Sequence, residues 1–248
     1  PLPQHSLIQV YTNHNEANSY SDPYRHILRY GDNLERILID NINQSKTSID
    51  VAIQELQLPH IVNALIDRQK AGVQVRLILE SLYSRGYSEY TPAEIAKFDR
   101  RVKQKYQDFV KFVDLDRDGK LSPAEIYQRD AIAILKNSEL PYLDDTADGS
   151  KGTGLMHHKF MVIDNNVVLT SSANYTMSDI HGDFTNLSSS GNTNNLLRIE
   201  NPEVAKLFTE EFNLMWGDGP GGTPNSLFGS KKPYRKVKYV LVGDAQIR

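Results

Sequence analysis

The strongest constraint on the fold is a strand, a helix and a second strand that follow one another within residues 47–80. Both strand segments, TSIDVAIQE and VQVRLILE, are rich in apolar residues, as expected for strands covered on both faces. The intervening LPHIVNALIDRQKAG has helical apolar spacing and ends at Gly72. A β-α-β unit predicts parallel strands, with ligands bound beyond their carboxyl ends. Here those ends are Gln54, Glu55 and Glu80.

Further elements extend this unit on both sides. We expect a strand at 6–12, a helix at 32–45 that begins with Asp32 and Glu35 as a capping box, and a strand at 194–200 followed by a helix. The chain is therefore predicted to be α/β, with a mixed, largely parallel sheet flanked by helices and an inserted helix-loop-helix. The expected parts are a first section of the lobe at 1–83, an insertion at 84–150, a second section of the lobe at 151–216, and an irregular tail at 217–248.

Composition narrows the chemistry that the chain can use. None of its 248 residues is cysteine, which excludes disulfides, thiolate catalysis and cysteine-ligated zinc. The formal net charge is -3, so any binding of phosphate must be local. No apolar stretch approaches the roughly 20 residues of a membrane-spanning helix, although peripheral membrane contact stays open. The absence of cysteine and a first residue Pro1 in place of Met favour a secreted or periplasmic location over a cytoplasmic one.

The predicted insertion contains DLDRDGKLSPAE, residues 114–125, which has the pattern of an EF-hand calcium loop. Oxygen donors recur at alternating positions, and Gly119 stands at the sixth, where the loop turns sharply. Sensor EF-hands come in pairs, so a structural calcium ion is expected in this single loop. The alternative is an acidic surface turn whose Ser122 and Glu125 only cap the next helix. The predicted ligands are Asp114, Asp116, Asp118, the carbonyl of Lys120, Ser122 through water, and Glu125.

A second polar pattern opens the predicted hairpin HHKFMVIDNNVVLTSS. Because side chains of a strand alternate between faces, His157 and Lys159 share one face and His158 points to the other. From the residue types alone, the alternative is a hydrogen-bonded core histidine beside a lysine whose ammonium extends to water.

From His157 onward the chain carries the pattern H-x-K-x4-D-x6-S-S-x-N, which resembles the signature of the phospholipase D superfamily. One residue departs from that signature, since Ser171 replaces the usual glycine. The segments 33–80 and 194–216 also resemble the family's opening β-α-β-α-β and its closing strand and helix. The resemblance therefore covers most of the chain outside the insertion and the tail.

The resemblance implies a phosphodiesterase that cleaves phospholipid headgroups through a phosphohistidine intermediate, with no catalytic metal. His157 would be the nucleophile or the general acid, and Lys159 would hold the non-bridging oxygens of the phosphate. Ser172 and Asn174 would donate hydrogen bonds to those oxygens. Asp164, at the turn, would orient the hairpin.

Two departures from the family pattern concern how the site is completed. In the family, a carboxylate often precedes the strand that follows the motif, and it orients the histidine. Here that position is Asn194-Asn195, and Asp183 is a candidate substitute. In addition, one motif supplies one histidine where the family pairs two. Either a homodimer brings His157 to its symmetry mate, or a second lobe follows, as the apolar run at 238–248 indicates by its likeness to the first strand.

Two other functions stay open from the sequence. An endonuclease would cleave DNA or RNA with the same residues, although the acidic net charge argues against a nucleic-acid partner. A catalytically inactive, calcium-binding lobe is the third, because Asn194 and Ser171 both depart from the family pattern. Aromatic residues in 83–90 and Tyr142 can contact acyl chains or bases equally well.

Overall fold

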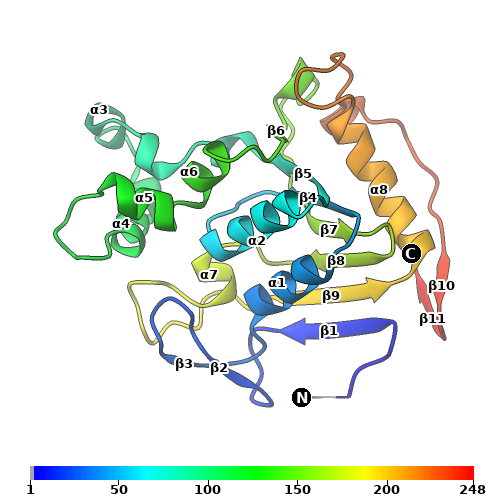
Figure 1. Cartoon of the computed structure of the whole chain (residues 1–248), viewed down its shortest axis with the longest axis horizontal. Coiled ribbons are helices and arrows are strands. Elements are labelled where there is room, and N and C mark those ends of the chain that lie inside the picture. The colour runs from blue at the N-terminus through cyan, green and yellow to red at the C-terminus, as the bar shows by residue number, and fades with distance from the viewer. Residues whose placement is uncertain (1–2) are drawn as a thin grey trace.

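The computed structural model describes residues 3–248, and a seven-stranded sheet forms the centre of this part of the chain (Figure 1). Its strands, in spatial order, are β1 (Ile8–Thr12), β9 (Asn195–Glu200), β8 (Val167–Ser171), β7 (Lys159–Ile163), β4 (Ser48–Ile53), β5 (Gln74–Leu79) and β6 (Tyr142–Asp144). The pairs β4–β5 and β5–β6 are parallel, whereas β4–β7, β7–β8, β8–β9 and β1–β9 are antiparallel. The expected mixed sheet flanked by helices is confirmed. Its parallel part is confined to β4, β5 and β6. The pair β7–β8 is antiparallel because a tight turn joins these strands.

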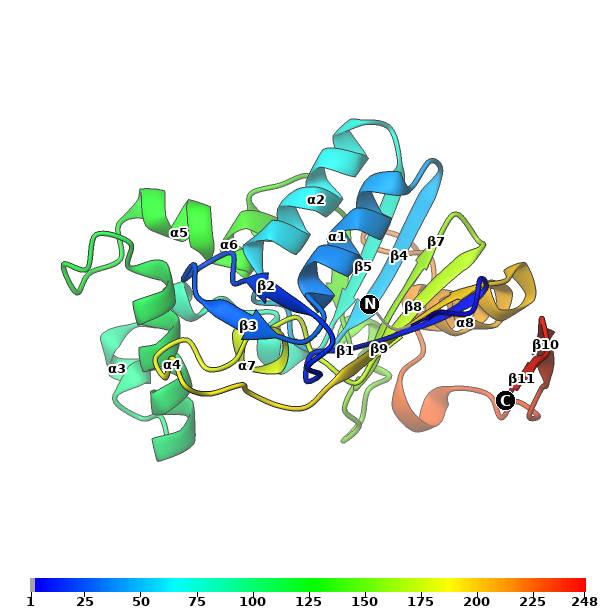
Figure 2. The ribbon, with the colours of Figure 1, turned by 90° about the horizontal axis from the view of Figure 1, so that it is seen from below.

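Helices cover both faces of the sheet (Figure 2). Two helices pack on one face, where Val51 and Met161 belong to the core, and a third packs on the other, over Ala52 and Phe160. Neighbouring residues of β4 and β7 thus enter different cores, and this double burial explains the continuous apolar runs of these strands. The three helices are α1 (Leu34–Gln44) and α2 (Pro59–Lys70) on the first face and α8 (Pro202–Trp216) on the second.

The first helix begins differently from the predicted capping box. Asn33 is the N-cap, and its side chain accepts a backbone N–H of the first turn. Glu35 is buried and turns into the core, where the Tyr24 hydroxyl donates to its carboxylate at 2.5 Å and Nε2 of His181 lies 2.7 Å away. The predicted capping box of Asp32 and Glu35 is therefore wrong, because buried polar partners from distant segments claim the Glu35 carboxylate.

The region 84–150, expected to lie outside the sheet, consists of two different parts. Its first part leaves the sheet and carries helices on either side of the predicted calcium loop, residues 114–125 (Figure 1). Its second part returns to the sheet, because a buried apolar helix packs against α2 and leads into β6, which pairs with β5. That helix and β6 belong to the lobe, as the crossover of a β-α-β unit. The helices of the region are α3 (Pro92–Ile95), α4 (Arg100–Val113), α5 (Pro123–Arg129) and α6 (Ala131–Lys136).

The tail from residue 217 is mostly irregular, as expected, and ends in a hairpin of β10 (Val240–Val242) and β11 (Ala245–Ile247). Val240 and Val242 are buried in the core under α8. The apolar run predicted to begin a further strand therefore pairs with itself. None of the helices in the described part of the chain has both the length and the hydrophobicity that a membrane span requires.

Candidate active site

The predicted catalytic pair lies where β7 begins. Lys159 is the first residue of β7 and pairs in register with Ile53, the last residue of β4, so both lie at the same edge of the sheet. The Lys159 side chain is 8% exposed, and its Nζ donates to Oε1 of Gln54 at 2.9 Å and to the carbonyl oxygen of His157 at 3.3 Å. His157, just before the strand, is exposed. The structure thus places a fixed ammonium group next to an accessible histidine.

The surroundings of this pair set its protonation. Partial burial lowers the pKa of His157, and the positive charge of Lys159 lowers it further. The imidazole is therefore neutral at pH 7, which a nitrogen nucleophile requires. Burial also lowers the pKa of Lys159, while the negative charges of Asp179 and Glu55 raise it.

Ser172 and Asn174, the motif residues that follow β8, differ in their hydrogen bonds. The Ser172 hydroxyl donates to Oδ1 of Asn194 at 2.8 Å and accepts the backbone N–H of Asn195 at 3.0 Å. Its single proton is thus used to join β8 to β9, and in this arrangement it is not offered to a phosphate. Oδ1 of Asn174, by contrast, is buried and has no hydrogen-bond partner within residues 3–248.

A buried carboxylate that the sequence analysis missed supports the motif. Asp179 accepts the backbone N–H of Asn174 at 2.9 Å with one oxygen and Nδ2 of Asn192 at 2.6 Å with the other. Asp183, the predicted substitute, accepts the Ser189 hydroxyl at 2.5 Å within its own loop. The sequence did not indicate a role for Asp179 in the site. It is the third residue of the short helix α7 (Met177–Ile180), where an acidic residue is expected for capping alone.

The remaining motif residues lie away from this edge. Nε2 of His158 lies 3.2 Å from Oε1 of Glu211 on α8, so His158 points to the opposite face, as predicted. Asp164 lies at the far end of the hairpin, one strand length from Lys159. Its carboxylate accepts the backbone N–H groups of Lys46, Thr47 and Ser48, which fastens the turn to the start of β4.

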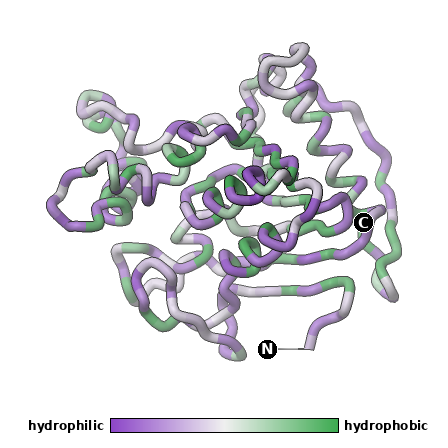
Figure 3. The backbone as a smooth tube through the Cα atoms, viewed as in Figure 1, coloured by the Kyte–Doolittle hydropathy of each residue, from purple (hydrophilic) through white to green (hydrophobic). Residues whose placement is uncertain are grey.

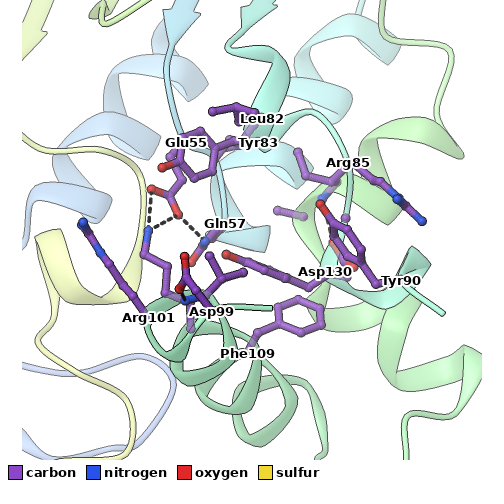
Figure 4. A pocket seen from close by; sticks show the side chains of 17 residues that line it. Glu55, Gln57, Leu82, Tyr83, Arg85, Tyr90, Asp99, Arg101, Phe109 and Asp130 are labelled. Carbon is purple, nitrogen blue, oxygen red and sulfur yellow. Dashed lines mark hydrogen bonds and ion pairs between the residues drawn. The ribbon is translucent and has the colours of Figure 1, made fainter. Parts of the chain in front are cut away.

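The insertion reaches the same edge of the sheet. A pocket of about 400 Å³ opens between the end of β4 and α4 (Figure 4). At its wall Glu55, which is 6% exposed, accepts a hydrogen bond from Nε2 of Gln57 at 2.6 Å and lies 3.4 Å from Nζ of Lys105. That ammonium also lies 5.3 Å from the ring centre of Tyr83. Burial raises the pKa of Glu55, and Lys105 opposes this shift. The sequence marked Glu55 as a strand end but gave no sign of Lys105.

The predicted calcium loop has converging carboxylates. Oxygens of Asp114, Asp116 and Asp118 all lie within 4.8 Å of one another, a spacing that fits a cation with Ca–O distances near 2.3–2.6 Å. Gly119 has φ +81°, as predicted for the sixth position, and the loop lies between α4 and α5. In Figure 3 it appears as a hydrophilic stretch.

Glu125, the last predicted calcium ligand, accepts hydrogen bonds from within the loop. Glu125 accepts the backbone N–H groups of Leu115 at 2.7 Å and Ser122 at 2.9 Å, together with the Ser122 hydroxyl at 2.7 Å. Hydrogen bonds from Ser122, followed by the one from Leu115, lower the pKa of Glu125 to about 2, so it is ionised in the folded protein. Ser122 and Glu125 also form the predicted capping box of α5.

A model of the family described as "Cardiolipin synthase, PLD-like domain" matches residues 38–216, most of the chain. The chain belongs to this PLD-like family. The match runs from within α1 to the end of α8, and so includes the strands β4 to β9 and residues 114–125.

Curated relatives of this PLD-like chain are mitochondrial cardiolipin hydrolases. The mouse (Mus musculus) protein is 38% identical over 63 residues, which is 25% of this chain and 24% of the mouse protein. The Xenopus laevis protein is 32% identical over 75 residues, 30% of this chain and 31% of that protein. The chain thus matches about a quarter to a third of the length of these relatives. The solved structure of Nuc, a phospholipase D family member from Salmonella typhimurium, has 20% identity and a TM-score of 0.47, covering 86% of this chain and 95% of that one.

Proposed function

We propose that this chain is a phosphodiesterase that cleaves phospholipid headgroups through a phosphohistidine on His157. The observation that supports the proposal is the buried Lys159 ammonium, held by Gln54 beside an exposed, neutral His157 at the open edge of a PLD-like lobe. A fixed positive charge at this point can stabilise the extra negative charge of a pentacoordinate phosphate. Phospholipid is preferred as substrate because the curated relatives are cardiolipin hydrolases.

The proposed reaction has two steps. An imidazole nitrogen of His157 attacks phosphorus, and the bond between phosphorus and the leaving oxygen breaks as that oxygen takes a proton from a general acid. Water then attacks the phosphohistidine, loses its proton to the same group and releases the histidine. Lys159 holds the non-bridging oxygens throughout, and the Asn174 side chain adds a polar contact. Ser172 and Asp164 act on geometry, through the β8–β9 contact and the hairpin turn.

The general acid in this proposal is His157 of a second copy, which carries the proton that the nucleophilic copy lacks, so the pair shares one proton between its two imidazoles. A two-fold dimer brings the two open edges together and supplies both histidines from one motif. Light scattering tests this directly. An active protein that stays strictly monomeric would contradict the dimer, and also the alternative of a second lobe elsewhere in a longer protein.

We also propose that the loop 114–125 binds one calcium ion in a structural role. Asp114, Asp116, Asp118 and Glu125 would supply carboxylates, Lys120 its carbonyl oxygen, and Ser122 a water-mediated contact. The convergence of the three aspartates supports this assignment. The ion would neutralise their charge and hold α4 against α5, and no step of the phosphodiester chemistry would use it.

A nuclease is the second candidate, favoured by one observation. The pocket beside Glu55 carries Tyr83 and Tyr90 together with Arg85 and Arg101, and tyrosine rings with cations also suit bases and their phosphates (Figure 4).

Headgroup release from phosphatidylcholine and cardiolipin, measured beside nicking of plasmid DNA, separates the candidates. Lipid turnover that disappears in His157→Ala supports the proposal. DNA nicking that disappears in the same variant would support the nuclease. A folded protein with neither activity would leave the calcium-binding lobe as its function.

A further inference from the structure

The chain concentrates positive charge in one short segment. Residues 231–248 contain six of its 28 basic residues and one of its 31 acidic residues, so the rest of the protein is markedly acidic. The basic residues cluster in KKPYRKVK, which runs along α8 towards β10 (Figures 1 and 3). We call residues 231–241 the tail strap. A local excess of this kind in an acidic protein indicates an anionic partner.

Large apolar side chains alternate with these cations and face solvent. Four large apolar side chains of the tail strap are more than half exposed, although the next residue, Val242, is fully buried. Cations mixed with exposed apolar groups are typical of surfaces that lie in the headgroup region of a bilayer. The exposed fractions are 90% for Tyr234, 54% for Val237, 60% for Tyr239 and 70% for Leu241.

A groove of about 480 Å³ lies between the tail strap and α8. Phe160, Leu207 and Phe208 supply its apolar side, and Lys236 and Val237 of the tail strap also line it. Such a groove accepts an acyl chain, with its anionic headgroup against the lysines. Nucleic acid has no group of this kind, so the groove favours lipid.

Some of the positive charge is already balanced by α8. Glu211 pairs with Lys232 at 2.5 Å and with Arg235, while Glu210 lies 3.5 Å from Lys238. These contacts fix the tail strap on the helix. Lys231 and Lys236 are exposed and make no ion pair within residues 3–248, so they are the cations most available to a partner.

We propose that the tail strap and its groove bind the surface of an anionic phospholipid bilayer. The position of the tail strap connects this surface to the candidate active site, because Lys232 and Gly229 line a cavity of about 280 Å³ together with His157. A bilayer on the tail strap therefore lies beside the catalytic edge. The inference does not depend on the proposed reaction, since binding is measurable without turnover.

The test uses the full chain with His157→Ala as background and measures sedimentation with vesicles. Vesicles of phosphatidylcholine with one third phosphatidylglycerol are expected to bind at least about tenfold more tightly than phosphatidylcholine alone, and 0.5 M NaCl is expected to remove the difference. Adding Lys231→Glu and Lys236→Glu is expected to weaken binding by about tenfold or more. The matched control is Lys70→Glu with Lys103→Glu, which reverses two exposed lysines elsewhere and is expected to leave binding within about twofold.

A second variant tests the apolar contribution. Tyr234→Ser with Leu241→Ser keeps every charge and is expected to weaken binding to anionic vesicles at least about threefold, with an unchanged melting temperature. Equal binding to neutral and anionic vesicles would overturn the proposal, as would equal losses in the two lysine pairs. Tight binding of a single-stranded oligonucleotide, lost in Lys231→Glu with Lys236→Glu and without binding of vesicles, would assign the tail strap to nucleic acid instead.

Discussion

Two regions of the molecule differ in how their charged groups are balanced. One is the candidate catalytic edge, where β4 ends and β7 begins, and the other is the predicted calcium loop. At the catalytic edge the ammonium of Lys159 is buried near Glu55 and Asp179, which come from separate elements and partly offset the effect of burial on its pKa. In the calcium loop three aspartates from five consecutive residues bring like charges within 4.8 Å of one another. The fold itself supplies the countercharge at the first region, whereas the second would need a bound cation to supply it. The first region is therefore expected to work without an ion, and the second to be stabilised by one.

The largest expected effect separates the two neighbouring histidines. His157→Ala should lower kcat/KM by about 10^4-fold or more, because the nucleophile or its partner acid is lost. His158→Gln, on the opposite strand face against Glu211, should stay within about fivefold of the parent. Headgroup release measures both. Equal losses in the two variants would show that the damage comes from disturbing β7.

Calcium should act on stability and leave turnover alone. At a free calcium concentration about 100 times its Kd, binding should stabilise the folded state by about 2.7 kcal/mol and raise the melting temperature. Asp114→Ala with Glu125→Ala should abolish that rise, whereas Asp40→Ala with Asp67→Ala, two acidic residues of α1 and α2, should retain it. Loss of turnover in EDTA, in protein that remains folded, would break the contrast between the two regions.

Removing the carboxylate at the far end of the hairpin should affect folding more than chemistry. Asp164→Ala should cost about 1–2 kcal/mol, because it leaves several backbone N–H groups of residues 46–48 without a partner at a partly exposed site. Urea unfolding measures this cost, and kcat of the folded variant should be unchanged. A kcat that falls as far as in His157→Ala would return Asp164 to the catalytic residues.

The same carboxylate should give this cost a pH dependence. Partial burial raises the pKa of Asp164, but hydrogen bonds from Thr47 and Ser48 outweigh it and leave the pKa below the ordinary value. A carboxylate whose pKa is lower in the folded state stabilises the folded protein at pH values above its unfolded pKa of about 3.9. That stabilisation is lost as the pH falls through the folded-state pKa. The difference between parent and Asp164→Ala should therefore shrink from pH 7 towards pH 2.

The smallest expected effect is on the titration of His157. Burial and then the charge of Lys159 lower its pKa, so Lys159→Met should raise the pKa towards the ordinary value of about 6.5. NMR titration of the imidazole measures this without any need for turnover. An unchanged pKa in Lys159→Met would mean that the ammonium lies too far from the imidazole to act with it.

Local patterns could be predicted from the sequence, and contacts between distant segments could not. The β7–β8 hairpin was predicted from its spacing, because its strands and turn lie within one short segment. The calcium site of residues 114–125 stays a prediction from the same kind of local spacing. Asp179 was missed and Glu35 was assigned to a capping box because each has the sequence context of a helix start, where an acidic residue has a sufficient local explanation. Their hydrogen-bond partners, His181 for Glu35 and Asn192 for Asp179, come from segments that no local pattern connects to them.

The sequence did not indicate that the end of the region 84–150 joins the sheet, for a related reason. The crossover helix α6 and the strand β6 are short, and they follow directly after polar helices. No turn or linker in the sequence separates them clearly from those helices. Whether a short apolar stretch belongs to a sheet is decided by the neighbour that it finds, here β5, and not by its own period. Lys105 could not be predicted either, because nothing in the sequence connects a lysine of a polar helix with Glu55.

The pairing of Ile53 with Lys159 joins residues more than a hundred positions apart. Such contacts make the centre of the sheet a late and slow step of folding, because a long stretch of chain must close before β7 can dock. The helices α4 and α5, on either side of the predicted calcium loop, lie within that stretch and contact each other, so an ion that joined them would shorten the free chain before the sheet closes. Calcium added during refolding should therefore speed the assembly of the sheet, even though its ligands lie outside the sheet itself.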